Sequence, residues 1–355
     1  MINEHTARVA PRVLSIATSN PGQPYTNEQL IELFDINDSK LVNHFRNSRI
    51  SRRYLTLPPA GTDGRVGSES SAELAAKHKR EAVAAGAEAT LLALEAAGLK
   101  PHDLDYIACV TSTGFLCPGL SALLAKALGL RPDVHRLDVV GMGCNAGLNG
   151  MQPVVNYCRL NPARHGALVC VEICSASYVF DATMRTAVVN SLFGDGAVAA
   201  VFGPHGPSTQ TGPEVLDFCS YVMTDHIDAM RFDHVDGKYS FFLDRDIPNV
   251  IGANVRYPID SLLAKNGLRM RDVAHWIIHS GGRKVIDAIK FNLGLSSHAL
   301  RHTESVLEDM GNLSSGSFLF SHRRLLQEQV AEPGDYTVMM TMGPGASIEC
   351  CLARF

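Results

Sequence analysis

Three residues, each in a turn that contains glycine, could together carry out nucleophilic chemistry: Cys144, His279 and Asn312. Cys144 follows a short apolar run and begins a predicted helix, where unpaired backbone N–H groups and the helix dipole favour an anion. We therefore expect a lowered thiol pKa and a thiolate nucleophile. His279 and Asn312 lie at the ends of regular elements, where α/β folds gather their sites. Taken singly, each has a structural alternative: a buried cysteine, a hydrogen-bonded histidine and a turn asparagine.

The elements around these residues are predicted to alternate between helices and strands. The capping-box sequence Thr26-Asn-Glu-Gln29 predicts a helix start, and the alanine-rich stretch 71–97 predicts a helix that ends at Gly98. Residues 105–111 and 137–142 predict strands, and the second is expected to be buried and to lead directly into the Cys144 turn. This alternation indicates an α/β fold rather than a sandwich or a helical bundle.

Several segments recur in the same order about 150 to 170 positions later. The pairs are Gly98–Leu104 with Gly267–Val273, Leu128–Leu130 with Leu293–Leu295, Met142–Cys144 with Met310–Asn312, and Phe193–Gly196 with Met342–Gly345. The last pair predicts two tight hairpin turns. We interpret the pattern as a duplication with halves 1–205 and 206–355, although α/β segments in general share glycine–leucine helix ends.

The composition excludes several classes of function. The 355 residues include 32 Lys and Arg against 36 Asp and Glu, a formal charge of -4 that offers no case for a nucleic-acid partner. No apolar run approaches the roughly 18 residues of a membrane-spanning helix, and residues 1–12 lack a secretory signal, so we expect a cytoplasmic protein that does not associate with membranes. The nine cysteines form no C-x-x-C pair, which argues against a zinc framework.

The sequence at all three chemical sites resembles one family. The segments are Gly141–Gly147, His279–Gly282, Gly311–Gly316 and Gly343–Gly345, and they look like those of the type III polyketide synthases, the chalcone synthase superfamily. The resemblance extends over nearly the whole chain, from Ser51–Tyr54 to the final predicted strand. It implies a thiolase-like fold of two duplicated, layered αβαβα halves. Within the superfamily, the segments 110–115, 184–196 and 240–244 are most similar to the bacterial 3,5-dihydroxyphenylacetyl-CoA synthases.

The resemblance also implies a reaction. Cys144 would hold an acyl group as a thioester, and His279 would keep its thiolate charged. His279 and Asn312 would also donate hydrogen bonds to the thioester oxygen of malonyl-CoA, which becomes an enolate when carbon dioxide leaves. Repeated condensation of malonyl-CoA, with four units that serve as starter and extender, would be followed by cyclisation to an aromatic product such as 3,5-dihydroxyphenylacetyl-CoA for antibiotic biosynthesis. The expected protein is a homodimer whose substrates are coenzyme A thioesters, without a further cofactor or a metal.

Other site residues follow from the same resemblance. Phe193 and Phe241 match the aromatic residues that separate the coenzyme A tunnel from the cavity, although core packing is the structural alternative. The remaining expected cavity residues are Cys117, Ser314, Gly343, Pro344 and Gly345. The basic residues that are candidates for the coenzyme A phosphates are Lys40, Arg46, Arg49, Arg52, Arg53 and Lys284, although such a charge run is also typical of a solvated face.

The chain also departs from the plant chalcone synthases. Cys117 stands where they have Met before Pro-Gly, Ser280 follows His279 in place of Pro, and Asn43 and Asn47 stand where basic residues are common. These differences favour a small starter such as malonyl-CoA over an aromatic one. The alternatives are another acyl-CoA starter that gives a resorcinol or pyrone, a β-ketoacyl-acyl-carrier-protein synthase of the initiating class, and a non-catalytic thiolase-fold subunit.

Overall fold

The computed structural model describes residues 10–177, 183–204, 212–235 and 238–355. Residues 1–9 of the N-terminal segment lie outside the described residues, and so does the predicted boundary between the halves at 205–206. Nine described strands form one mixed sheet, and its first part, in spatial order, holds β5 (His135–Val139), β4 (Leu104–Val110), β6 (His165–Glu172), β7 (Gly196–Gly203) and β1 (Arg12–Ser19). Its second part holds β8 (Glu214–Val222), β13 (Ser347–Arg354), β12 (Tyr336–Gly343) and β11 (Val273–Ile278).

The two parts of the sheet repeat one pairing pattern. β1 is antiparallel to β7, β7 is antiparallel to β6 and β6 is parallel to β4, while β8, β13, β12 and β11 pair in the same three ways. Only the pair Arg12 and Glu214 joins β1 to β8. The arrangement is the thiolase-like α/β fold that the sequence predicted. The division of the chain at residue 205 stays a prediction.

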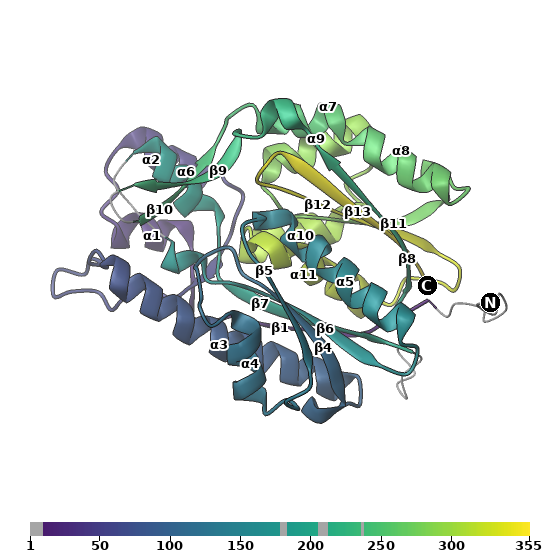
Figure 1. Ribbon diagram of the computed structural model, residues 1–355. Coiled ribbons are helices and arrows are strands. Elements are labelled where there is room, and N and C mark those ends of the chain that lie inside the picture. Colours follow the sequence, from purple (N-terminus) through teal and green to yellow (C-terminus); the bar gives the residue numbers. More distant parts are fainter. Residues whose placement is uncertain (1–9, 178–182, 205–211, 236–237) are drawn as a thin grey trace, which may run out of the picture.

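Helices fill the space between and outside the two parts of the sheet (Figure 1). α5 (Ala146–Leu160) and α11 (Ser317–Glu328) share a central core with both parts, as Met151, Leu325, Leu168 and Met339 illustrate. The outer helices on the first part are α3 (Ser71–Ala96) and α4 (Leu120–Leu128), and those near the second are α7 (Ile247–Asn254), α8 (Arg256–Lys265), α9 (Arg283–Leu293) and α10 (Arg301–Met310). Among the described residues, none of the helices has the length and apolar character needed to cross a membrane.

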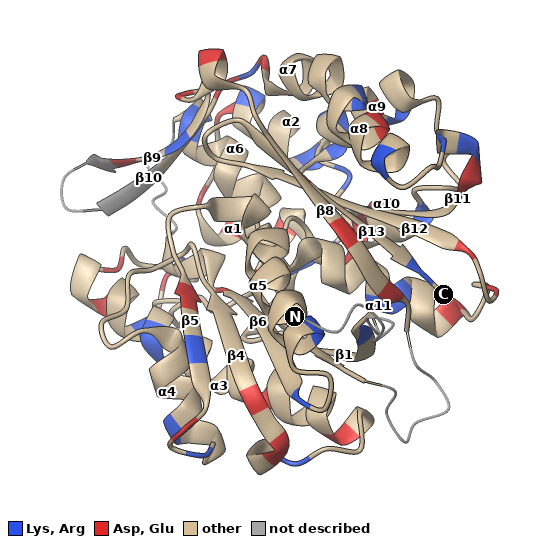
Figure 2. Ribbon diagram, turned by 45° about the vertical axis from the view of Figure 1, so that its right-hand side comes forward, with Lys and Arg blue, Asp and Glu red and all other residues tan. Residues whose placement is uncertain are grey.

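The smaller elements surround the end of the sheet where the site lies. They are β2 (Gln23–Tyr25), α1 (Asn27–Leu33), α2 (Ser39–Arg46), β3 (Arg53–Leu55), α6 (Met184–Leu192), β9 (Met230–Val235) and β10 (Lys238–Leu243). β9 and β10 form a separate hairpin, and β2 pairs with β3. Charged residues of both signs are interspersed over the elements (Figure 2).

Local signals predicted several elements correctly. Thr26 caps α1 with both hydrogen bonds of a capping box, α3 ends one residue before the predicted end, and residues 342–345 turn between β12 and β13. Two predictions were wrong. β5 is a largely exposed edge strand, because it pairs only with β4 among the described strands. Residues 193–196 are not a hairpin turn, because they connect α6 to β7.

Candidate active site

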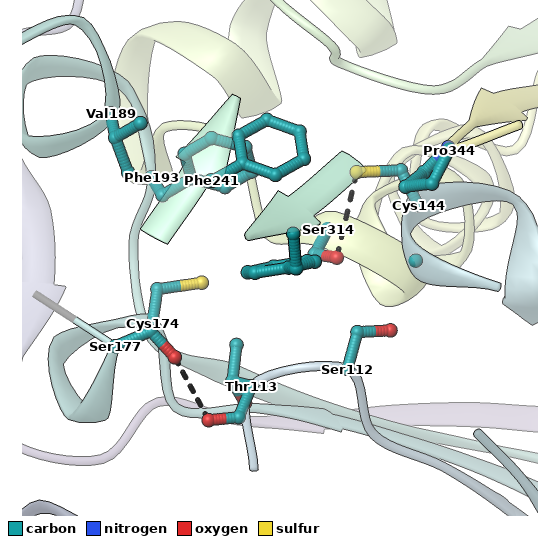
Figure 3. A pocket seen from close by; sticks show the side chains of 12 residues that line it. Ser112, Thr113, Cys144, Cys174, Ser177, Val189, Phe193, Phe241, Ser314 and Pro344 are labelled. Atoms are coloured by element: carbon teal, nitrogen blue, oxygen red, sulfur yellow. Dashed lines mark hydrogen bonds between the residues drawn. The ribbon is translucent and has the colours of Figure 1, made fainter. Parts of the chain in front are cut away.

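Cys144 lies in a single 3-10 turn, Gly143–Asn145, immediately before α5. Its side chain is 8% exposed, and Sγ lies 3.5 Å from Ser314 Oγ in hydrogen-bond contact (Figure 3). Gly143 has a φ of 63°, and a Cβ there would lie 2.5 Å from Pro344 Cδ. Only glycine fits such a left-handed, crowded position without strain, so the β12–β13 hairpin holds the nucleophile turn by close contact.

His279 follows β11, and its backbone N–H donates to Met340 O at 2.8 Å, which extends the β11–β12 pairing. The side chain is 2% exposed, and Nδ1 has no hydrogen-bond partner among the described residues. Gly281 covers the ring, since a Cβ at that position would lie 3.0 Å from Cδ2. Burial lowers the pKa of His279 to about 3, so the imidazole is neutral at ordinary pH.

Asn312 lies in the turn that follows α10. Its backbone N–H donates to Leu192 O at 2.9 Å, and its carbonyl accepts from Gly194 N at 3.0 Å, which fixes the turn beside the end of α6. Oδ1 accepts from Ser314 N at 2.8 Å, and Nδ2 donates to Gly281 O at 3.4 Å. Ser314 therefore links Asn312 to Cys144, and Gly281 links it to His279. The three residues predicted from the sequence are brought together.

The electrostatic state of Cys144 differs from the sequence expectation. Burial raises the pKa of its thiol to about 12, the hydrogen bond from Ser314 lowers it, and Glu172 raises it further. The start of α5 does not offset the loss of hydration. Burial thus favours the uncharged forms of both Cys144 and His279. A thiol proton must leave when sulfur attacks a thioester, and an uncharged imidazole is a group that can accept it.

A small cavity of about 30 Å³ lies beside the nucleophile. Its lining residues are Ser112, Thr113, Gly143, Cys144, Cys174, Ser177, Val189, Phe193, Phe232, Phe241, Ser314 and Pro344. Figure 3 shows Phe193 and Phe241 on one side of this space and Thr113, Cys174 and Ser177 on another. The predicted Phe193 and Phe241 meet edge to face, with ring centroids 5.7 Å apart. His279 and Asn312 are not among the described residues that line this cavity.

Sequence reasoning missed several of these lining residues. Ser112 and Thr113 follow β4, in a segment that carried the family resemblance but had received no role. Cys174, to which no role had been given, is a second thiol in the cavity. Phe232 lies on β9, and its ring centroid is 4.9 Å from that of Phe241. No local pattern marks Phe232, because the β9–β10 hairpin brings it to the cavity.

A second cavity of about 440 Å³ adjoins the first. Ser112, Gly143, Phe232 and Pro344 line both, and Gly345 lines the larger one. Of the other expected cavity residues, Gly343 packs against Asn145, since a Cβ there would lie 2.6 Å from Asn145 Oδ1. Cys117 is exposed and is not among the described residues that line either cavity.

The basic residues expected at coenzyme A have different environments. Lys40, Arg49, Arg52 and Lys284 are exposed, while Arg46 makes a bidentate ion pair with Glu28 at 2.8 and 2.9 Å. Burial, followed by the charge of Lys284, lowers the pKa of His44, which places Lys284 beside α2. Lys40 precedes His44 by one helical turn and shares that face.

Arg53 does not fit a contact with a phosphate at a tunnel mouth. Its side chain is fully buried at 0% exposure, and one Nη donates to Asn27 Oδ1 at 3.0 Å. The aliphatic part packs under the Asn312 turn, because a Cβ on Gly311 would lie 2.9 Å from Arg53 Cδ. A single sequence cannot show that one member of a basic run turns inward. Among the described residues, no group of three or more His, Cys, Asp or Glu is arranged to hold a metal ion.

Comparison with known proteins identifies the family. The model for the N-terminal domain of chalcone and stilbene synthases matches residues 7–206, and that for the C-terminal domain matches residues 228–355. The 3,5-dihydroxyphenylacetyl-CoA synthase of Streptomyces toyocaensis is 50% identical over 97% of this chain and 90% of its own, and that of Amycolatopsis orientalis is 49% identical over 97% and 93%. The crystal structure of PKS-I from Ectocarpus siliculosus has a TM-score of 0.89 at 27% identity and covers 99% of this chain and 100% of its own. The chain belongs to the chalcone and stilbene synthase family and is a type III polyketide synthase, an acyltransferase.

Proposed function

We propose that this enzyme condenses four malonyl-CoA units, one as starter and three as extenders, and cyclises the chain to 3,5-dihydroxyphenylacetyl-CoA. The observation that carries the proposal is the contact chain from Cys144 through Ser314 to Asn312, beside two adjoining cavities of about 30 and 440 Å³. Three phenylalanines line the cavity beside Cys144. Two relatives named 3,5-dihydroxyphenylacetyl-CoA synthase, which are 50 and 49% identical over 97% of this chain, support the same product.

The first step loads the starter. Cys144 Sγ attacks the thioester carbonyl of the starter, His279 accepts the thiol proton, the C–S bond to coenzyme A breaks, and coenzyme A leaves as the thiolate. Burial raises the pKa of the Cys144 thiol and lowers that of His279, which supports proton transfer during attack. The Ser314 hydroxyl, at 3.5 Å, donates to the sulfur as its negative charge develops.

The second step forms the carbon–carbon bond. Malonyl-CoA loses carbon dioxide, and its thioester oxygen becomes an enolate that accepts hydrogen bonds from His279 and Asn312 Nδ2. The enolate carbon attacks the acyl carbon on Cys144, the C–S bond breaks, and the extended chain leaves on coenzyme A. Among the residues that the structure describes, Asn312 Nδ2 makes one long contact, 3.4 Å, to Gly281 O, so it retains donor capacity for the enolate.

Coenzyme A binding is proposed at the face shared by Lys284 and Lys40. Both are exposed, and Lys284 already influences His44 on α2. Two ammonium groups on facing elements suit the phosphates of the nucleotide. The enzyme is proposed to act in the cytoplasm, where reducing conditions keep Cys144 as the free thiol that the structure shows.

The functional unit is proposed to be a homodimer. β5 is the last strand of the sheet, and beside its end Phe115 and Val140 are 71% and 53% exposed. Exposed apolar side chains next to an open sheet edge are typical of an interface. Multi-angle light scattering at micromolar concentration should give twice the chain mass of 38.4 kDa, and a monomer there would contradict this part of the proposal.

The reaction is tested with purified protein and malonyl-CoA as the sole substrate. Mass spectrometry should find a dihydroxylated aromatic acyl-CoA, and Cys144→Ala should fold normally but give no extended product. His279→Gln should lose decarboxylation as well as loading. A product that forms only with another acyl-CoA starter, or a pyrone from malonyl-CoA alone, would contradict the proposed substrate and ring closure. Dependence on an acyl-carrier protein would point to the β-ketoacyl synthase alternative.

A further inference from the structure

The sulfur of Cys144 is closed off from solvent in this structure. The residue is 8% exposed, and the cavity of about 30 Å³ beside it has room for roughly two water molecules. The residues that this cavity shares with the larger one border the passage between them, and they are Ser112, Gly143, Phe232 and Pro344. An acyl thioester therefore reaches the Cys144 sulfur only when part of this lining moves.

The β9–β10 hairpin, which carries Phe232, is the part of the lining with the weakest backbone attachment. Among the described residues, β9 and β10 pair only with each other, whereas Ser112 and Pro344 follow strands of the nine-stranded sheet. Gly345 N–H donates to Met230 O at 3.3 Å at the base of the hairpin. Figure 1 shows the hairpin beside α6 and apart from the large sheet. Its place over the cavity therefore depends on side-chain contacts.

The two faces of the hairpin carry different side chains. Phe232 and Phe241 are directly opposite each other and line the cavity beside the nucleophile. Successive side chains of a strand alternate between its faces, so Arg231 and Asp233 lie on the other face. Asp233 accepts from Arg231 Nε and from Arg185 Nη2 of α6, each at 2.8 Å. Arg185 Nε also donates to Phe241 O at 3.5 Å, so one guanidinium joins α6 to both strands of the hairpin.

We propose that the Arg185–Asp233 ion pair is a latch that holds the hairpin over Cys144 and controls the access of acyl thioesters to the sulfur. The two side chains are 39% and 28% exposed, so their attraction is weak enough to break and re-form, and it is screened by salt. The open latch lets Phe232 and Phe241 move aside, and the closed latch keeps water from the thioester on Cys144. Arg185 and Asp233 are positioning residues, because neither is among the described residues that line the two cavities.

The test measures access to Cys144 with N-ethylmaleimide, a neutral reagent that the charges of the protein neither attract nor repel. Mass spectrometry of the peptide that contains Cys144 gives the labelling rate at about 50 and about 500 mM NaCl. In the parent, the higher salt concentration should raise the rate about threefold, as expected for an exposed ion pair. Arg185→Gln should show the raised rate at both salt concentrations. Arg185→Lys, which keeps the charge, should retain at least half of the parent's salt response.

A matched pair of ionic contacts elsewhere supplies the control. Glu214 accepts from Arg12 and Arg354 at 3.0 and 3.1 Å, as Asp233 does from its two arginines, and Arg354→Gln should keep the parent's rate and salt response. The double variant Arg185→Gln/Asp233→Asn should be labelled no faster than Arg185→Gln, because both changes break one pair.

The parent's rate and salt response in folded Arg185→Gln would overturn the inference, and so would an equal change in Arg354→Gln. If Arg185→Gln does not fold, Asp233→Asn decides alone. The inference goes beyond the proposed function, because the labelling of Cys144 is measured without a substrate. A different product from malonyl-CoA would contradict the proposed function and leave the latch standing.

Discussion

Ser314 is the residue through which the two halves of the site meet. Its hydroxyl contacts Cys144 Sγ from the first half of the chain, and its backbone N–H holds Asn312 in the second. From the sequence, Ser314 is expected only as a cavity residue. The structure shows its contact with the sulfur, and this hydrogen bond lowers the pKa of the buried thiol.

Ser314→Ala should slow the alkylation of Cys144. Loss of the hydrogen bond raises the pKa of the thiol, so less thiolate is present at a fixed pH, and one such bond corresponds to roughly a fivefold change. The rate of inactivation by iodoacetamide at pH 8 measures this directly. Ser321→Ala is the control, because Ser321 is also buried but its Oγ donates to Ser317 O within α11. Equal inactivation rates for Ser314→Ala and the parent would contradict the role given to Ser314.

Phe232 is expected to limit the size of the space beside Cys144. It lines both cavities, and its ring meets Phe241 at 4.9 Å. Phe232→Ala should join the two spaces and allow longer polyketides or a larger starter such as hexanoyl-CoA. We expect the use of hexanoyl-CoA as starter, relative to malonyl-CoA as starter, to rise at least tenfold when both are present. The control is Phe242→Ala on β10, which removes a ring that lies 4.2 Å from the Arg231 guanidinium. It should leave the choice of starter unchanged if Phe232 limits the size of the starter.

At the scale of elements, close backbone contact holds the nucleophile. The turn before α5 packs against the β12–β13 hairpin at Gly143 and Pro344, and a second contact places Gly343 against Asn145. The catalytic geometry therefore depends on two turns that are distant in the sequence. This contact, rather than a catalytic role, explains why glycine occupies positions 143 and 343.

Gly143→Ala should disturb the site far more than a comparable change elsewhere. Its φ of 63° strains any side chain, and the new methyl would meet Pro344 at 2.5 Å. Gly129 supplies the control, because its φ is 62° but nothing lies within 4 Å of a Cβ there. Gly129→Ala should cost about 1 kcal/mol of unfolding free energy, and Gly143→Ala about 3 kcal/mol or more with loss of condensation. If urea unfolding gave equal losses of unfolding free energy for the two variants, the β12–β13 hairpin would have moved to make room for the methyl group, and the prediction would be wrong.

The elements also show what the sequence could predict. Thr26, the alanine-rich α3 and the Gly343–Gly345 turn carry their signals within a few residues, so these elements were predicted correctly. The exposure of β5 depends on which strand lies beside it, and the inward direction of Arg53 depends on Asn27 and the Asn312 turn. These are contacts between distant segments. The Cys–His–Asn set was accessible because three motifs resembled one family, whereas Phe232 lies outside those motifs.

At the scale of the whole molecule, buried ionisable groups set the response to acid. Burial lowers the pKa of His78 to about 4, of His279 to about 3 and of His322 to about 4 from the ordinary 6.5. The unfolded chain therefore binds more protons than the folded one below pH 6.5, and stability falls as the pH falls toward 4. Asp195 acts in the opposite direction, because burial raises its pKa to about 6. Burial also raises the pKa values of Glu172 and Glu349 and lowers those of His44 and His302. Among the described residues, five such histidines against three such carboxyls favour a net loss of stability.

His322→Leu should reduce this acid sensitivity. His322 is fully buried on α11, neither ring nitrogen has a hydrogen-bond partner among the described residues, and His275 and His302 disfavour its protonation further. The unfolding free energy is measured with urea at pH 7, 6 and 5. Between pH 6 and 5 it should fall less steeply in His322→Leu than in the parent, by about 1.4 kcal/mol per pH unit, the value for one proton. His226→Gln, at an exposed site, should keep the parent slope. A His322→Leu slope equal to the parent's would mean that His322 gains its proton without unfolding, which its burial without a partner argues against.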